Sequence, residues 1–364
     1  MHRALALSGA LLLVACSGGS ATTAPTTKEQ LGSLLFSDQN LSNPAGQSCA
    51  DCHAPSAGYA DPEDDHSTSG GAVAGRFGPR NAPTARYTKY IPPLHFDADA
   101  NAFKGGLFVD GRADTLEAQA AKPLLNPIEM NNADAASVAA TVRAAAYADR
   151  FRGVFGTSSL DDDNEALTHV TEAIAAFERT QTLAPFTSKY DQYLRGKATL
   201  TPQEQNGLAI FEDPQRGNCA SCHPDKPSAD GTPPLFTDFG YANLGIPKYT
   251  NSLYLRMPVS LNPAGSAFID HGLMATVGDA AQDGKFRTPT LRNVALTDPY
   301  GHNGYFFDLR YMLTFLNTRD DGQWAAPEVA ANLDQRIGHL GLSDADIDDL
   351  LAFLNTLTDG SSSP

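Results

Sequence analysis

The sequence has little positive charge and no long hydrophobic run. Its 364 residues contain 26 lysines and arginines against 42 aspartates and glutamates, a formal net charge of −16. This balance argues against nucleic acid or an anionic membrane surface as a partner; it would suit a basic partner protein, or serve solubility alone. The apolar run at residues 4–14 is too short to span a bilayer.

Cysteine is also scarce. Four of the five cysteines fall in two Cys-x-x-Cys-His motifs, formed by Cys49, Cys52 and His53 and by Cys219, Cys222 and His223. In this pattern two thiols attach covalently to the vinyl groups of one haem and the histidine ligates its iron. A zinc site would require the two cysteine pairs to meet in space, and neither zinc nor two disulfides would explain the histidine after each pair. The motifs therefore predict two covalently bound haem c groups.

The fifth cysteine, Cys16, ends an N-terminal targeting segment. Residues 1–15 have the form of a lipoprotein signal peptide, so we expect Cys16 to become the lipidated first residue of the mature chain; the alternative is an ordinary signal peptide. Residues 16–27 read as a flexible tether. Ser17, directly after Cys16, favours release of the lipoprotein to the outer membrane over retention in the inner membrane. We expect a periplasmic, lipid-anchored protein, which fits haem c attachment outside the cytoplasm.

An internal repeat indicates the fold. Residues 29–36 and 204–211 share Glu, Gln, Gly and Phe at matching positions, and each run precedes a haem motif. We expect a helix over residues 28–36, and closing helices over 166–182 and, capped by Ser343, over 344–357. The prediction is an all-α protein of two class I cytochrome c-like domains, each with one covalent haem c. Long irregular loops, residues 54–102 and 225–289, would wrap the haems.

The expected domain limits follow from the same landmarks. The first haem c domain would cover residues 28–195 and the second residues 196–360, with a disordered tail at 361–364. The boundary precedes Thr201, a helix cap followed by Pro202 at the first helical position.

Several ordered motifs resemble the bacterial dihaem cytochrome c peroxidases and the related MauG-type enzymes. They lie at residues 80–84, 108–119, 125–130, 286–294 and 299–304. The resemblance implies that His53 holds the peroxidatic haem and His223 the electron-transfer haem. It makes Glu129 the distal acid–base carboxylate, rather than a surface carboxylate, and Gln119 its partner in the distal pocket.

The resemblance carries further implications. Asn81, with the carbonyls of Thr297 and Pro299, would form a calcium site. Arg112 and Arg292 would either pair with haem propionates or be surface or interdomain arginines. A homodimer is also implied.

Three positions depart from the family pattern. Val109 stands where the family has a tryptophan between the haems, and the chain's one tryptophan is Trp324. Leu316 occupies the position of the second ligand of the electron-transfer haem. Met312, Tyr311 and Met274 are candidate replacements, or core residues. His66 lies where some members hold an inhibitory histidine, but it also suits a solvated loop.

The first hypothesis is therefore a cytochrome-c peroxidase that reduces hydrogen peroxide with electrons from a cytochrome c or a cupredoxin. The alternatives are a MauG-like oxidase acting on a partner protein, and a dihaem electron-transfer protein without peroxidase activity. Reduction of peroxide requires a distal group that moves a proton between the two oxygens.

Overall fold

The computed structural model describes residues 26–62 and 68–360 of the protein. The predicted signal peptide, Cys16, most of the tether, His66 and the tail at 361–364 lie outside these residues. Within them, no helix is both long enough and apolar enough to cross a membrane.

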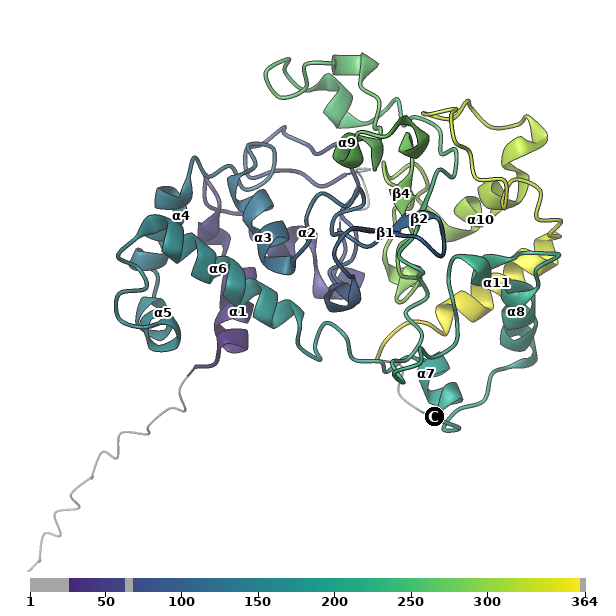
Figure 1. Ribbon diagram of the computed structural model, residues 1–364, viewed down its shortest axis with the longest axis horizontal. Helices are drawn as coiled ribbons and strands as arrows, with labels where there is room; N and C mark the ends of the chain where they lie inside the picture. The colour runs from purple at the N-terminus through teal and green to yellow at the C-terminus, as the bar shows by residue number, and fades with distance from the viewer. Residues whose placement is uncertain (1–25, 63–67, 361–364) are drawn as a thin grey trace, which may run out of the picture.

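The described chain is mostly helical, as expected. The α-helices are α1 (Lys28–Phe36), α2 (Cys49–Cys52), α3 (Leu116–Leu125), α4 (Ala135–Ala144), α5 (Ala148–Phe155), α6 (Asp163–Glu178), α7 (Lys189–Leu194), α8 (Pro202–Glu212), α9 (Met274–Val277), α10 (Leu309–Thr318) and α11 (Asp344–Asn355). Figure 1 shows α1 to α6 on one side of the molecule and α8, α10 and α11 on the other.

Two small sheets lie between these helix groups and were not predicted. Strands β1 (His95–Asp97) and β2 (Ala102–Lys104) pair antiparallel, as do β3 (Tyr241–Ala242) and β4 (Phe286–Arg287). Tyr241 lies opposite Arg287 in the second pair. Strands of two or three residues are too short to show an alternating pattern, so the loop prediction for 54–102 and 225–289 was wrong at these points.

The repeated glycine marks where two helix pairs cross. A Cβ added to Gly32 of α1 would lie 1.8 Å from the carbonyl oxygen of Ala173 in α6. A Cβ added to Gly207 of α8 would lie 2.0 Å from the carbonyl oxygen of Asp349 in α11. Only a residue without a side chain allows these backbones to approach so closely, so the repeat in the sequence encodes a repeated helix crossing.

The predicted helix starts at Pro202 and Asp344 are confirmed, whereas the second closing helix ends at Asn355 and not at residue 357. Thr201 and Ser343 cap α8 and α11 with reciprocal capping boxes, and Pro202 begins α8. The first closing helix differs from the prediction of 166–182, because α6 begins at Asp163 and ends at Glu178. It ends early because the amide and the hydroxyl of Thr180 both donate to the carbonyl of Phe177, at 2.9 and 2.7 Å, which a continuing helix would pair with the amide of Gln181.

Two hydrophobic cores fill the two helix groups. The first is built on α1 and α4 to α6, around Leu31, Leu35 and Phe151, and the second on α7, α8 and α11, around Phe211 and Phe353. Polar contacts join the two groups. Arg80 donates to Asp110 at 2.6 Å and to Asp270 at 2.6 and 2.8 Å.

Candidate functional site

The second Cys-x-x-Cys-His motif follows α8 directly. Cys219–Ser221 form a single 3₁₀ turn, after which Cys222 and His223 follow. The Nδ1 of His223 lies 2.7 Å from the carbonyl oxygen of Phe236. Because a carbonyl only accepts, this nitrogen carries the proton and Nε2 keeps its lone pair. Burial also lowers the pKa of the imidazole, which favours the neutral form that binds metals.

The first motif repeats this arrangement in the other helix group. Cys49 and Cys52 lie on α2, whose start is capped by Ser48 and Asp51. The Nδ1 of His53 lies 3.2 Å from the carbonyl oxygen of Tyr59, and burial again lowers the pKa of the imidazole. Each motif therefore presents two thiols and one neutral imidazole whose Nε2 is free to ligate.

The zinc and disulfide alternatives do not fit this geometry. Cys49, Cys52, Cys219 and Cys222 are all free thiols. Across residues 26–62 and 68–360, no three histidine, cysteine or acidic side chains gather as a metal site would require. Burial raises the pKa of Cys52 and of Cys219 to about 12, whereas zinc binds thiolates.

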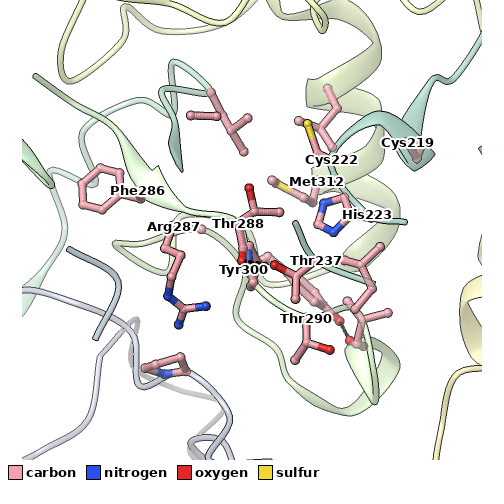
Figure 2. Close-up of a pocket in the computed structure, with 18 of the residues that line it drawn as sticks. Cys219, Cys222, His223, Thr237, Phe286, Arg287, Thr288, Thr290, Tyr300 and Met312 are labelled. Carbon is pink, nitrogen blue, oxygen red and sulfur yellow. Dashed lines mark hydrogen bonds between the residues drawn. The ribbon is translucent and has the colours of Figure 1, made fainter. Parts of the chain in front are cut away.

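A cavity of about 310 Å³ opens beside the second motif. Cys219, Cys222 and His223 line one part of it, α10 and α11 add apolar residues, and residues of the segments 81–88, 235–246 and 286–302 line much of the rest. Figure 2 shows His223 and Met312 next to each other, with Arg287 on the opposite side of Thr288. An apolar cavity with two thiols and a free imidazole nitrogen at its wall fits a covalently attached haem.

The structure distinguishes the candidates for a second ligand to the iron of the haem at the second motif. Leu316 lines the cavity, where it can only pack, and Met312 lines it one helical turn earlier on α10. Met274 does not line this cavity. Tyr311 does not line it either; its side chain is 47% exposed and its ring packs on Trp324 at 5.0 Å. Of Met312, Tyr311 and Met274, Met312 alone lines the cavity, so its thioether is the remaining candidate ligand.

Glu129 and Gln119 lie ten positions apart in the chain. Gln119 is on α3, and Glu129 follows the end of that helix in a turn closed by Asn126. Burial raises the pKa of Glu129, although the side chain of Asn126 and the charge of Arg112 oppose the rise. The charge of Glu129 also raises the pKa of Cys52, so the carboxyl lies in the neighbourhood of that thiol.

The turn that carries Glu129 is covered by the segment after residue 67. The amide of Ala72 donates to the carbonyl of Glu129 at 2.9 Å. A Cβ added to Gly71 would lie 1.9 Å from the carbonyl oxygen of Ile128. The backbone around Gly71 therefore holds the Glu129 turn in place.

The residues of the predicted calcium site are brought together. Asn81, Thr297 and Pro299 all line the cavity, and the side-chain amide of Asn81 contacts the carbonyl oxygen of Pro299. The backbone amide of Asn81 also donates to the carbonyl of His302 at 2.9 Å. Such oxygens suit calcium, which stays a prediction.

The structure separates the two roles suggested for Arg292. This residue is 1% exposed and forms two hydrogen bonds with Asp191, at 2.8 and 2.9 Å, so it is a buried structural arginine. Arg112 donates from one terminal nitrogen to Asp110 at 2.8 Å and lies 3.5 Å above the ring of Phe108. Its pairing with a haem propionate stays a prediction.

Two buried ionisable groups were missed in the sequence. Arg287 is 9% exposed and lines the cavity. Glu178 is 7% exposed, and its Oε2 has no hydrogen-bond partner in the described part of the chain. Burial raises the pKa of Glu178 to about 8, and its charge would act on Cys49. Neither has a signal in the sequence, because burial and partners depend on long-range packing.

Known proteins resemble this chain over nearly its whole length. The model of the di-haem cytochrome c peroxidase family matches residues 26–199. The methylamine utilization protein MauG of Paracoccus denitrificans is 38% identical, covering 99% of this chain and 96% of that protein. Cytochrome c551 peroxidase of Pseudomonas aeruginosa is 30% identical, covering 91% and 78%.

Solved structures show the same likeness. The diheme peroxidase BthA from Burkholderia thailandensis E264 has a TM-score of 0.79 and 36% identity, covering 92% of this chain and 86% of that chain. A MauG-like protein associated with microbial copper homeostasis has a TM-score of 0.69 and 31% identity, covering 93% and 91%.

Proposed function

Because the chain belongs to the di-haem cytochrome c peroxidase family, we propose that it reduces hydrogen peroxide to water with electrons from a small donor protein. The observation that carries the proposal is Glu129, a buried carboxyl whose pKa is raised and whose charge acts on Cys52 of the first haem motif. A carboxyl tuned upward by burial can take a proton and return it near neutral pH.

The family implies two haem c groups, whose irons supply the redox chemistry when bound. His53 would hold the first from Nε2, and His223 the second. Met312 would supply a thioether to the second iron, in place of the ligand that Leu316 cannot provide. Each of the two halves would form one class I cytochrome c-like domain, divided near residue 195.

Glu129 acts on the peroxide rather than on the haem. When haem is bound, Glu129 would accept a proton from one peroxide oxygen and return it to the other, which would leave as water as the O–O bond breaks, with the two electrons supplied by the haems and, through them, by the donor protein. The Gln119 amide hydrogen-bonds the peroxide and orients it toward Glu129. Arg112, whose charge lowers the pKa of Glu129, keeps part of the carboxyl population ionised and able to accept that proton.

A second candidate function is a MauG-like oxidase that acts on a partner protein. The similarity to the MauG of Paracoccus denitrificans, over 99% of this chain, favours it. In that case the same Glu129 would serve the peroxide, and the electrons would come from side chains of the partner.

The setting of the enzyme is also proposed. The acidic surface suits a basic cytochrome c or cupredoxin as the donor. Cys16 would anchor the protein by lipid to the outer membrane, facing the periplasm. A calcium ion at Asn81, Thr297 and Pro299 and a homodimeric assembly complete the proposal.

Turnover of hydrogen peroxide with reduced cytochrome c, before and after partial reduction of the haems, tests the proposal. Oxidation of the cytochrome coupled to peroxide loss supports the peroxidase. Peroxide consumption that occurs only with a partner protein, and leaves that partner oxidised, supports the oxidase. If neither occurs in protein with both haems attached, the remaining hypothesis is a dihaem electron-transfer protein.

A further inference from the structure

Arg287 is a buried cation for which the protein supplies no counter-ion. It ends β4 beside the cavity and is 9% exposed. Burial lowers the pKa of its guanidinium, and only the weaker influence of Tyr241 opposes this. The group is therefore held in surroundings that disfavour its charge.

The hydrogen bonds of Arg287 satisfy only part of the side chain. Its backbone amide donates to the carbonyl of Val109 at 2.8 Å. Its Nε donates to the carbonyl of Phe108 at 3.3 Å. For its two terminal nitrogens, the described residues offer neither a hydrogen bond nor a carboxylate within 4.0 Å.

The other buried arginines show what is missing. Arg292 holds Asp191 at 2.8 Å, and Arg319 holds Asp320 at 2.7 Å. An isolated buried ion costs several kcal/mol, and a planar guanidinium recovers this best from a two-pronged carboxylate. Arg287 therefore lacks the kind of partner that its neighbours in the fold have.

The position of Arg287 indicates where that carboxylate comes from. The cavity that it lines is the one that Cys219, Cys222 and His223 also line. Figure 2 shows the guanidinium extending away from β4, on the far side of Thr288 from His223. A haem carries two propionate carboxylates on the edge remote from its thioether-forming vinyl groups.

We propose that Arg287 binds a propionate of the haem attached at Cys219 and Cys222. The inference depends on haem attachment at that motif, which is part of the proposed function, but not on peroxide turnover. The bound propionate neutralises the guanidinium and fixes the haem edge next to Val109, between the two helix groups. Because the guanidinium offsets the negative charge of the propionate, it makes addition of an electron to this haem more favourable, which raises its reduction potential.

The test compares Arg287→Gln, Arg287→Lys and the control Arg310→Gln in protein with both haems attached. Arg310 is a half-exposed cation on α10 that already pairs with Asp348. Midpoint potentials of both haems are measured by spectroelectrochemical titration without peroxide. We expect Arg287→Gln to lower the potential of the second haem, Arg287→Lys to retain most of it, and Arg310→Gln to leave it unchanged.

The assignment is overturned if Arg287→Gln leaves both potentials unchanged, or lowers only that of the first haem. If Arg287→Gln does not accumulate with haem, the propionate bending mode is compared between Arg287→Lys and the wild type by resonance Raman spectroscopy. A shifted propionate bending mode supports the contact, and an unshifted mode contradicts it. If the wild-type protein shows no peroxide turnover but Arg287→Gln lowers the potential of the second haem, the proposed function fails and this contact stands.

Discussion

Replacing Gly207 by alanine should weaken the helix crossing that supports the second haem motif. The added Cβ would lie 2.0 Å from the carbonyl oxygen of Asp349 and 2.8 Å from the Cβ of Phe353. Both are below the 3.0 Å that real Cβ contacts keep, and the nearer one is backbone that cannot rotate away. Helices α8 and α11 must therefore separate by about 1 Å, which loosens the packing of Phe211 and Phe353.

The cost can be estimated from its parts. Overpacking a core costs about 1–3 kcal/mol and occasionally more. Alanine regains about 1 kcal/mol over glycine as a helix former. Because the clash is with backbone, we place the overpacking term at or above its upper limit, so the net loss is about 2 kcal/mol or more. The midpoint of thermal unfolding should then fall by roughly 4–8 °C for a unit of this size.

The matched control is Gly153→Ala in α5. Its added Cβ would meet no heavy atom within 4 Å, so only the gain in helix propensity, about 0.5–1 kcal/mol, should remain. Thermal unfolding followed by circular dichroism measures both variants in the haem-loaded protein. The reasoning is refuted if Gly207→Ala unfolds at or above the wild-type temperature, or if Gly153→Ala is the more destabilised of the two.

Three further predictions concern buried charge and the haem ligands. Asp191→Asn should cost about 3–5 kcal/mol in denaturant unfolding, because it leaves Arg292 buried without its carboxylate. Burial acts to raise the pKa of Asp191, but the hydrogen bonds and charge of Arg292 outweigh it, so the net pKa lies below the ordinary value. The stability that this pair contributes is therefore present above pH ~4 and is lost on acidification. If Asp191→Asn loses stability on acidification in the same way as the wild type, this reasoning is contradicted. Met312→Leu should convert the second haem from low to high spin in the electron paramagnetic resonance spectrum, whereas Met274→Leu should not; identical spectra for all three proteins exclude Met312 as a ligand. Arg112→Gln should move the acid limb of peroxide turnover to higher pH, because it removes a charge that lowers the already raised pKa of Glu129; a limb that stays in place or moves to lower pH would show that Arg112 does not act on this carboxyl.

The sequence predicts those features of the fold that depend on local or repeated signals. The haem motifs, the caps at Thr201 and Ser343, and the helix at residues 28–36 depend on neighbours a few positions apart. The matched glycines, Gly32 and Gly207, could be seen to repeat, but their physical reason appears only when the facing carbonyls are in place.

The features that the sequence does not predict depend on contacts between residues far apart in the chain. Asp191 lies 101 positions from Arg292, and nothing near either residue marks them as a pair. The role of Arg287 depends on the absence of a carboxylate around it, which no motif encodes. The short strands β3 and β4 form because segments 241–242 and 286–287 meet beside the cavity, and not because either has a strand pattern.

The central claim, that Glu129 serves peroxide at the first haem, is tested most directly by steady-state peroxide reduction in wild-type protein and in Glu129→Gln. Both would carry two haems and receive electrons from the same reduced cytochrome c. The account predicts a fall in turnover of about 10²–10⁴-fold, with spectra and haem content unchanged. The decrease in wild-type turnover on acidification, which should begin above the ordinary carboxyl pKa of 4.5, should be absent in Glu129→Gln. Wild-type turnover in Glu129→Gln would contradict it.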